Sequence, residues 1–184
     1  MNKKALIVIV ASLAMVLLTL TGCGHASDYY VVRGNALFAE GKYGDAAITY
    51  RKAIQKAPES GEAHYRLALA QLAIGYTNDA YQELSRASEL LPSRDDIKVE
   101  QANVGLAFYV SDPRRPQNLY ARLAAIAQQL LAKDPNSYDG LRLQGHLAKT
   151  DGKLQEAEDY FRRANAVKPL QPNVSSGLSR NIPA

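Results

Sequence analysis

The sequence predicts an all-α fold, an α-solenoid of about four helix pairs that follows a short N-terminal export segment. Three observations predict it. Proline recurs at a spacing of 34 residues, at Pro58 and Pro92 and again at Pro135 and Pro169. Between the prolines, apolar residues recur with the three-to-four-residue period of amphipathic helices. No stretch alternates apolar and polar residues convincingly, so we expect no β-sheet.

Composition places the chain among globular proteins. It has 184 residues, of which 47% are hydrophobic and 22% charged, which excludes collagen-like, mucin-like and wholly disordered classes. A single cysteine excludes an intramolecular disulfide framework and a cysteine-based zinc site. The formal charge of +4 falls to +2 without Lys3 and Lys4, which is weak support for nucleic-acid binding. We therefore expect no nucleic-acid partner.

The first 22 residues have the layout of an export signal. Lys3 and Lys4 form a positive head, and the 16 residues 5–20 carry no charge. As a helix that run is roughly 24 Å long, shorter than the roughly 30 Å hydrocarbon core of a membrane. A short apolar run after a positive head is typical of a cleaved signal peptide rather than of a transmembrane span.

Leu20-Thr-Gly-Cys23 ends this apolar run and contains the only cysteine of the chain. It resembles the bacterial lipobox. The resemblance implies cleavage after Gly22, a diacylglycerol on the Cys23 thiol and acylation, such as with palmitate, of the new amino terminus. Residues 23–26 would then be the lipidated cysteine and a short linker. The alternative is an uncleaved anchor helix with a buried cysteine.

Gly24 follows the lipidation site. In enterobacterial sorting an aspartate at this place retains lipoproteins in the inner membrane. The resemblance therefore implies a membrane-anchored, periplasm-facing lipoprotein, with the outer membrane favoured over the inner.

The body of the chain is built of units of about 34 residues. Gly34 to Ala46 and Gly145 to Ala157 share Gly, Gly, Lys and Ala at equivalent places. The pattern resembles the tetratricopeptide repeat, which implies a right-handed solenoid over residues 27–171, with repeats at 27–60, 61–94, 95–137 and 138–171. The periodicity predicts helices at 28–41, 44–57, 61–75, 78–91, 95–110, 117–133, 138–151 and 154–167. Glycines after the first helix of a pair end that helix, and prolines stop the second.

Small and large residues alternate where paired helices approach each other. Small residues recur at Gly34, Ala46 and Ala53, while Tyr50 and its equivalents Leu84 and Phe161 fill the adjacent space. The third unit exchanges the sizes in its second helix, with large residues at Leu123 and Leu130 and a small one at Ala127. We expect that exchange to preserve the packed volume.

The third unit also has nine extra residues, around the segment 110–118. One interpretation is a binding loop, in which Arg114 and Arg115 meet a phosphate or carboxylate. The other is a tolerated surface insertion, because lengthening a loop costs little. We favour the surface insertion.

Catalytic patterns are missing from the sequence. The three histidines, His25, His64 and His146, belong to no metal-binding or paired His/carboxylate spacing, and no nucleotide-binding or hydrolase fingerprint occurs. We expect His64 to pack between helices. The sequence therefore predicts a protein that is not an enzyme and holds no cofactor or metal.

The first helices of the repeats line the concave face of such a solenoid. The resemblance implies that this groove takes an extended or helical peptide. Matching the groove-facing positions gives a predicted binding set: Asn35, Phe38, Tyr65, Arg66, Leu69, Leu72, Asn103, Leu106, Arg142 and His146. Surface exposure or inter-repeat packing is the alternative role for each residue taken singly.

These features predict a membrane-anchored interaction scaffold, similar to the tetratricopeptide lipoproteins that serve pilus assembly, exopolysaccharide export or outer-membrane assembly. The alternative is a regulatory subunit that tethers a cell-wall or envelope enzyme at the membrane. Residues 172–184 contain Pro172, Gly177 and Pro183, so we expect a flexible tail. The outward face of the last helix would then be incompletely covered, and a partner or a second copy would cover it.

Overall fold

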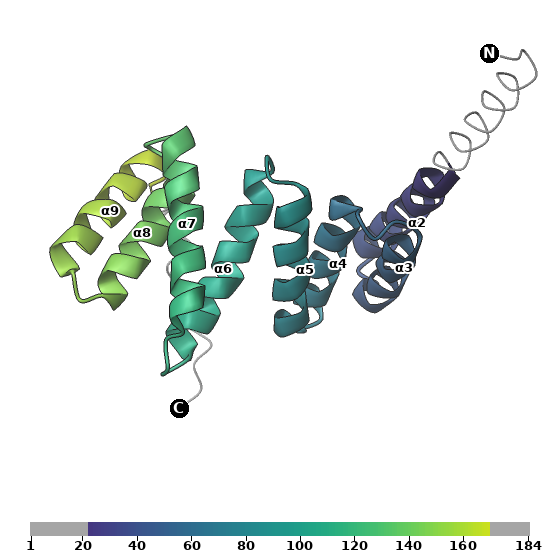
Figure 1. The fold of residues 1–184 in the computed structure, drawn as a ribbon, viewed down its shortest axis with the longest axis horizontal. Coiled ribbons are helices and arrows are strands. Elements are labelled where there is room, and N and C mark those ends of the chain that lie inside the picture. Colours follow the sequence, from purple (N-terminus) through teal and green to yellow (C-terminus); the bar gives the residue numbers. More distant parts are fainter. Residues whose placement is uncertain (1–21, 170–184) are drawn as a thin grey trace, which may run out of the picture. The chain divides into compact units, whose positions relative to one another are not determined.

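The computed structural model describes the backbone of residues 22–169 and the side chains of residues 27–169. Eight α-helices and no strand occur in this described part (Figure 1). The predicted signal peptide, the Cys23 thiol and the predicted tail 172–184 lie outside the residues or side chains that are described. The helices are α2 (Gly22–Ala39), α3 (Tyr43–Lys56), α4 (Gly61–Ala73), α5 (Thr77–Leu90), α6 (Asp95–Ser111), α7 (Gln117–Lys133), α8 (Tyr138–Thr150) and α9 (Leu154–Val167).

The all-α fold class predicted from the sequence is confirmed, and α7 and α9 have the predicted bounds. Residues 23–26, which were expected to form a short linker, are part of a helix. Helix α2 begins at Gly22, so the backbone of residues 23–26 is helical and continuous with the first repeat. No proline interrupts the segment between Gly22 and Ala39, which leaves nothing to break the helix there.

The chain forms two compact units, one up to Ile97 and one from Lys98. In the first unit, α2 packs on α3, α3 on α4, and α4 on α5. In the second, α7 packs on α8 and α8 on α9, while buried residues of α6 join the core formed with α7 and α8.

Glycine turns end the first helix of three pairs, as the sequence predicts. Gly41 has φ of 75°, in the left-handed region that glycine adopts without strain. The next residue, Lys42, donates its N–H to the Leu37 carbonyl at 2.9 Å, which closes a Schellman motif. Gly75 and Gly152 repeat this geometry. The second helices α3, α5, α7 and α9 each end two residues before the proline of their unit.

The predicted small–large alternation forms the contacts within the helix pairs. Tyr50 of α3 is 1% exposed and lies against Gly34 of α2, where an added Cβ would come within 2.4 Å of the ring. The equivalent pair in the second unit is Phe161 of α9 against Gly145 of α8. The missing Cβ lets an aromatic ring occupy the space between two closely packed helices.

The α7 residues at which large and small side chains are exchanged are also buried. Leu123, Ala127 and Leu130 are all part of the core of the second unit. On the α6 side that core includes two large residues, Leu106 and Tyr109.

The nine extra residues of the third unit mostly lengthen its helices. Helix α6 has 17 residues where α4 and α8 have 13, and α7 has 17 where α3, α5 and α9 have 14. The connecting loop 112–116 is only two residues longer than the loops 40–42, 74–76 and 151–153. The insertion therefore adds about one turn to each helix and only a short extension to the loop.

His64 packs between helices, as predicted, and bridges two segments with both ring nitrogens. Its Nδ1 lies 2.6 Å from Glu83 Oε2 of α5, and its Nε2 lies 3.0 Å from the Pro58 carbonyl oxygen. Both partners are acceptors, so the protonated ring, which donates from both nitrogens, fits best. The hydrogen bond to Glu83 is the main reason that the pKa of His64 is raised above its usual 6.5.

This arrangement predicts a pH-dependent stability. Because the folded pKa of His64 is raised, its contribution is fully present below about pH 6.5 and is lost as pH rises through the folded pKa. The contribution is about 1 kcal/mol, since the pair is partly solvated. Urea unfolding at several pH values should therefore show wild-type protein losing more stability between about pH 6 and pH 9 than His64→Gln. Glu83→Gln should behave like His64→Gln, and an unchanged pH profile in both variants would contradict the assignment.

Candidate functional site

A cavity between α6 and α8, here called the α6–α8 cavity, collects three residues of the predicted binding set: Asn103, Leu106 and His146. Its volume is about 600 Å³, in the range of pockets that hold a small ligand or a few peptide side chains. All of its lining belongs to the unit from Lys98. The lining residues are Asn103, Leu106, Ala107, Val110, Ser111, Arg115, His146, Lys149 and Thr150.

The apolar wall of the α6–α8 cavity comes from α6. Leu106 is only 7% exposed because it is also part of the core, whereas Val110 is 56% exposed. Ala107 lies between them and is exposed as well. With Asn103, these residues follow the spacing of one helix face, and the extra turn of α6 brings Val110 and Ser111 into that face. Ala107 and Val110 were not predicted from the sequence, although their spacing from Asn103 could have indicated them.

Asn103 offers a partly used amide at the side of this cavity. Its Nδ2 donates to Glu100 Oε2 at 3.2 Å, and its Oδ1 accepts a hydrogen bond from Arg142 of α8. An asparagine amide has two donor hydrogens and two acceptor lone pairs. One donor and one acceptor position of Asn103 therefore remain for a peptide backbone, held in place by α6 and α8 together.

The charge of the cavity is positive. Lys149 and Arg115 line it, and Arg115 Nη1 donates to the Thr150 carbonyl oxygen at 3.1 Å. His146 is neutral at pH 7, because burial, and then the charges of Arg142 and Lys149, lower its pKa below 6.5. The site thus combines an apolar wall, an amide and two cations, which suits an apolar side chain next to a carboxylate.

The insertion loop uses its arginines internally. Arg114 Nε and Nη2 donate to the two Asp112 carboxylate oxygens at 3.0 and 2.9 Å, and this contact lowers the pKa of Asp112. Arg115 has φ of 46° and reaches back to α8. The geometry supports the surface insertion for Arg114, while Arg115 contributes to the α6–α8 cavity.

The first unit holds six residues of the predicted binding set. Asn35 Oδ1 accepts a hydrogen bond of 2.8 Å from the hydroxyl of Tyr50, so this side chain secures the core ring. Phe38 packs against the core of the unit and edge-on to Tyr43, with ring centroids 4.9 Å apart. Leu69 and Leu72 are half-buried.

Tyr65 and Arg66 belong to a charged cluster in the same unit. The guanidinium carbons of Arg66 and Arg94 lie 5.9 and 5.4 Å from the centroid of the Tyr65 ring, within reach of a cation–π interaction. Glu62 accepts from Arg66 at 2.6 Å and from Arg94 at 3.1 Å. These contacts hold the tyrosine and both arginines in fixed places.

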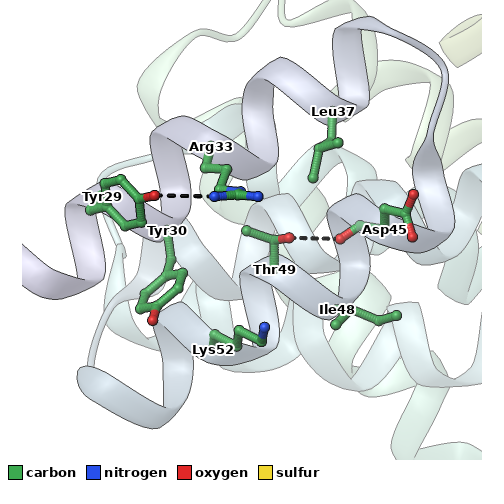
Figure 2. A pocket seen from close by; sticks show the side chains of 8 residues that line it. All are labelled: Tyr29, Tyr30, Arg33, Leu37, Asp45, Ile48, Thr49 and Lys52. Carbon is green, nitrogen blue, oxygen red and sulfur yellow. Dashed lines mark hydrogen bonds between the residues drawn. The ribbon is translucent and has the colours of Figure 1, made fainter.

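A second hollow, the α2–α3 pocket, was not predicted from the sequence. Its volume is about 460 Å³, and it is lined by Tyr29, Tyr30, Arg33, Leu37, Asp45, Ile48, Thr49 and Lys52 (Figure 2). Its side chains come from the mutually facing sides of α2 and α3.

A third hollow lies on α8 and α9 and has a volume of about 250 Å³. Its lining includes Tyr138, Phe161 and Lys168, and the Lys168 ammonium nitrogen lies 5.3 Å from the centre of the Tyr138 ring. His146 lines both this hollow and the α6–α8 cavity. Helix α9 of this pair is the last helix, whose outward face the sequence predicts to be incompletely covered.

Neither a metal site nor a membrane span is found in the described part of the chain. Its side chains, from residue 27 to residue 169, include no group of three or more His, Cys, Asp or Glu placed to hold a metal ion. None of the helices α2 to α9 combines the length and hydrophobicity that crossing a membrane requires.

Comparison with known proteins gives the repeat type. The profile of the tetratricopeptide repeat matches residues 37–99. The sequence has no significant match among curated proteins.

Solved structures give the fold. A fragment of MamA from Desulfovibrio magneticus RS-1 aligns with a TM-score of 0.66 at 15% identity, covering 80% of this chain and 78% of that fragment. PilF of Pseudomonas aeruginosa aligns with a TM-score of 0.60 at 21% identity, covering 84% of this chain and 67% of the PilF chain. TTC0263, a tetratricopeptide protein of Thermus thermophilus, aligns with a TM-score of 0.57 at 22% identity. The alignment covers 83% of this chain and 79% of the TTC0263 chain. The chain therefore has the tetratricopeptide α-solenoid fold, with the family profile itself matched over residues 37–99.

Proposed function

We propose that this chain is a non-enzymatic, membrane-anchored scaffold that binds a protein partner through the α6–α8 cavity. The observation that carries the proposal is the assembly of Asn103, Leu106 and His146, predicted from the sequence as binding residues, around one cavity. The fold supports it, because stacked repeats create extended concave surfaces for binding.

The chemistry of the cavity defines the partner. A peptide with an apolar side chain fits the wall formed by Leu106, Ala107 and Val110. An acidic group beside that side chain would meet Lys149 and Arg115. The remaining donor and acceptor positions of the Asn103 amide suit a backbone group of the bound peptide.

Blocking the cavity should remove partner capture. Ala107→Arg places a long cationic side chain in the cavity, so we expect loss of the proteins that co-purify with the tagged, detergent-solubilised chain. The matched control is Ala125→Arg, at an exposed position of α7 that does not line the cavity. Both variants should keep the wild-type helical circular-dichroism signal, because exposed substitutions change stability by within about 0.5 kcal/mol. Equal capture by both variants would contradict the proposed site.

The anchoring part of the proposal rests on the lipobox that ends at Cys23. Two or more acyl chains hold a protein stably on a membrane. Helix α2 contains Cys23 in its second position, so the lipid would be attached directly to the first helix of the repeat body. We further propose that the repeats face the periplasm and that Gly24 directs the protein to the outer membrane.

Replacing the anchor residue tests this directly. Cys23→Ala removes the acyl acceptor, so palmitate labelling should disappear and the precursor should keep its signal segment. The control is Asp28→Asn, at an exposed position five residues further along α2, which should label and mature like the wild type. Normal labelling and maturation of Cys23→Ala would show that the lipobox interpretation is wrong.

A further inference from the structure

We propose that the α2–α3 pocket is a contact site for the phosphate head groups of anionic phospholipids, so that this face of the first unit lies on the membrane that holds the lipid anchor. The inference rests on the anchoring at Cys23 proposed above. It adds a second membrane contact made by the folded repeats themselves.

The pocket contains two cations without a carboxylate partner. Among residues 27–169, Arg33 of α2 donates only to the Tyr29 hydroxyl, at 3.2 Å, and Lys52 of α3 makes no ion pair. Figure 2 shows both side chains between the two helices, with Asp45 at the opposite end of the pocket from Tyr29 and Tyr30. Such a pair of cations accommodates an oxyanion, and the phosphate of a lipid head group is one.

The cations continue along α3 toward the lipid anchor. Lys56 lies four residues after Lys52, on the same row of the helix, and Arg51 is the residue next to Lys52. Neither Lys56 nor Arg51 pairs with a carboxylate among residues 27–169. Among residues 27–56 the acids are Asp28, Glu40 and Asp45 and the cations are Arg33, Lys42, Arg51, Lys52 and Lys56, so positive charges predominate.

The two helices place this charge close to Cys23. The Ser27 hydroxyl donates to the Ala53 carbonyl oxygen at 3.3 Å, which fixes the start of α2 beside the end of α3. Tyr29 is six residues after Cys23 on the continuous helix α2, about 9 Å along its axis. An acylated Cys23 at the membrane surface would therefore hold the Tyr29 end of the pocket within about one Debye length of the lipid phosphates.

Apolar and aromatic groups at this end suit the interface as well. Tyr29, Val32 and Ile48 are exposed by 57%, 68% and 53%. Tyrosine rings favour the boundary between head groups and acyl chains, because one end is apolar and the other forms hydrogen bonds. An anionic lipid surface therefore matches the pocket in charge, in apolar contact and in position relative to the anchor.

The test uses the mature full chain, purified from membranes and placed in lipid nanodiscs. One set contains phosphatidylcholine alone, and the other equal parts of phosphatidylcholine and phosphatidylglycerol. The readout is the rate at which an amine-acetylating reagent modifies Lys52 and Lys56, with Lys153 and Lys168 as internal references. We expect slower modification of Lys52 and Lys56 in the phosphatidylglycerol discs, unchanged references, and loss of the difference at about 1 M salt, where the Debye length is about 3 Å.

A charge-removing variant tests the pocket itself. One cation near an anionic surface changes the docked-to-undocked ratio about fivefold, so Arg33→Gln should reduce the protection of Lys52 and Lys56 by that factor. The matched control is Arg162→Gln on α9, which removes the same charge from an exposed side chain whose partner among the described residues is Asp159. It should leave the protection unchanged, and circular dichroism should show both variants folded.

Each other outcome overturns the inference. Equal modification rates in both discs, or protection that Arg33→Gln leaves intact, excludes contact through this pocket. Protection by free glycerol phosphate in phosphatidylcholine discs would make it a soluble-phosphate site, and protection by polyglutamate a site for an acidic protein. Intact mass distinguishes the two proposals: an acylated chain without the lipid effect rejects only this inference, whereas a chain without acyl groups rejects the anchoring as well.

Discussion

Gly34→Ala is expected to lower the free energy of unfolding by about 2 kcal/mol, although alanine is the better helix former. The new Cβ would lie 2.4 Å from the Tyr50 ring, which is 1% exposed. A hydrogen bond from the Tyr50 hydroxyl to Asn35 holds this ring in place. Overpacking of a core destabilises a protein by up to about 3 kcal/mol. The higher helix propensity of alanine offsets about 1 kcal/mol of that loss. Urea unfolding followed by circular dichroism measures the difference.

Gly44→Ala is the matched control, because Gly44 is also helical and has open space where its Cβ would be. It should leave stability unchanged or raise it by up to about 1 kcal/mol. Adding Tyr50→Leu to Gly34→Ala should recover part of the lost stability, since the smaller side chain leaves room for the Cβ. A neutral Gly34→Ala would mean that the ring can move aside and that the close helix approach does not depend on glycine.

Leu123→Ala is expected to have the largest effect on stability, a loss of about 3 kcal/mol. Leu123 of α7 is 1% exposed and belongs to the core that α6, α7 and α8 form. Removing a buried leucine side chain loses its transfer free energy and leaves a cavity that the neighbouring helices fill incompletely. The midpoint of urea unfolding should fall accordingly.

Leu154→Ala provides the comparison at a surface position, because Leu154 of α9 is 63% exposed. We expect a change within about 0.5 kcal/mol. Similar losses in both variants would contradict the assignment of Leu123 to the core. They would also remove the physical basis for the exchanged pattern of large and small residues in α7.

Local sequence features predicted the helices because each depends on residues close together in the chain. Gly41, Gly75 and Gly152 end helices through a backbone conformation that glycine adopts readily. Prolines limit the second helices, and the three-to-four-residue apolar period sets their buried faces. The pairing of Gly34 with Tyr50 was also predictable, because three of the four units place a large residue, Tyr50, Leu84 or Phe161, at the same position of the second helix.

The binding features were only partly predictable. Resemblance to the tetratricopeptide repeat predicted Asn103, Leu106 and His146 as groove-facing residues of first helices, and the structure brings them around one cavity. The period could not show that Asn35 is bonded to Tyr50, since this contact joins two helices. Similarly, the contact between Asn103 and Arg142 joins residues 39 positions apart. Such contacts depend on how two helices approach, which a repeat pattern leaves open.

The sequence by itself determined the helix pairs, their turns and the small–large alternation. Only the tertiary structure decided that the nine extra residues lengthen α6 and α7, and that Val110 thereby joins the α6–α8 cavity. It also placed Arg33 of α2 and Lys52 of α3 in one pocket. The physical reason is that helix formation depends on neighbours three and four residues away, whereas a cavity depends on side chains that meet only when separate helices pack.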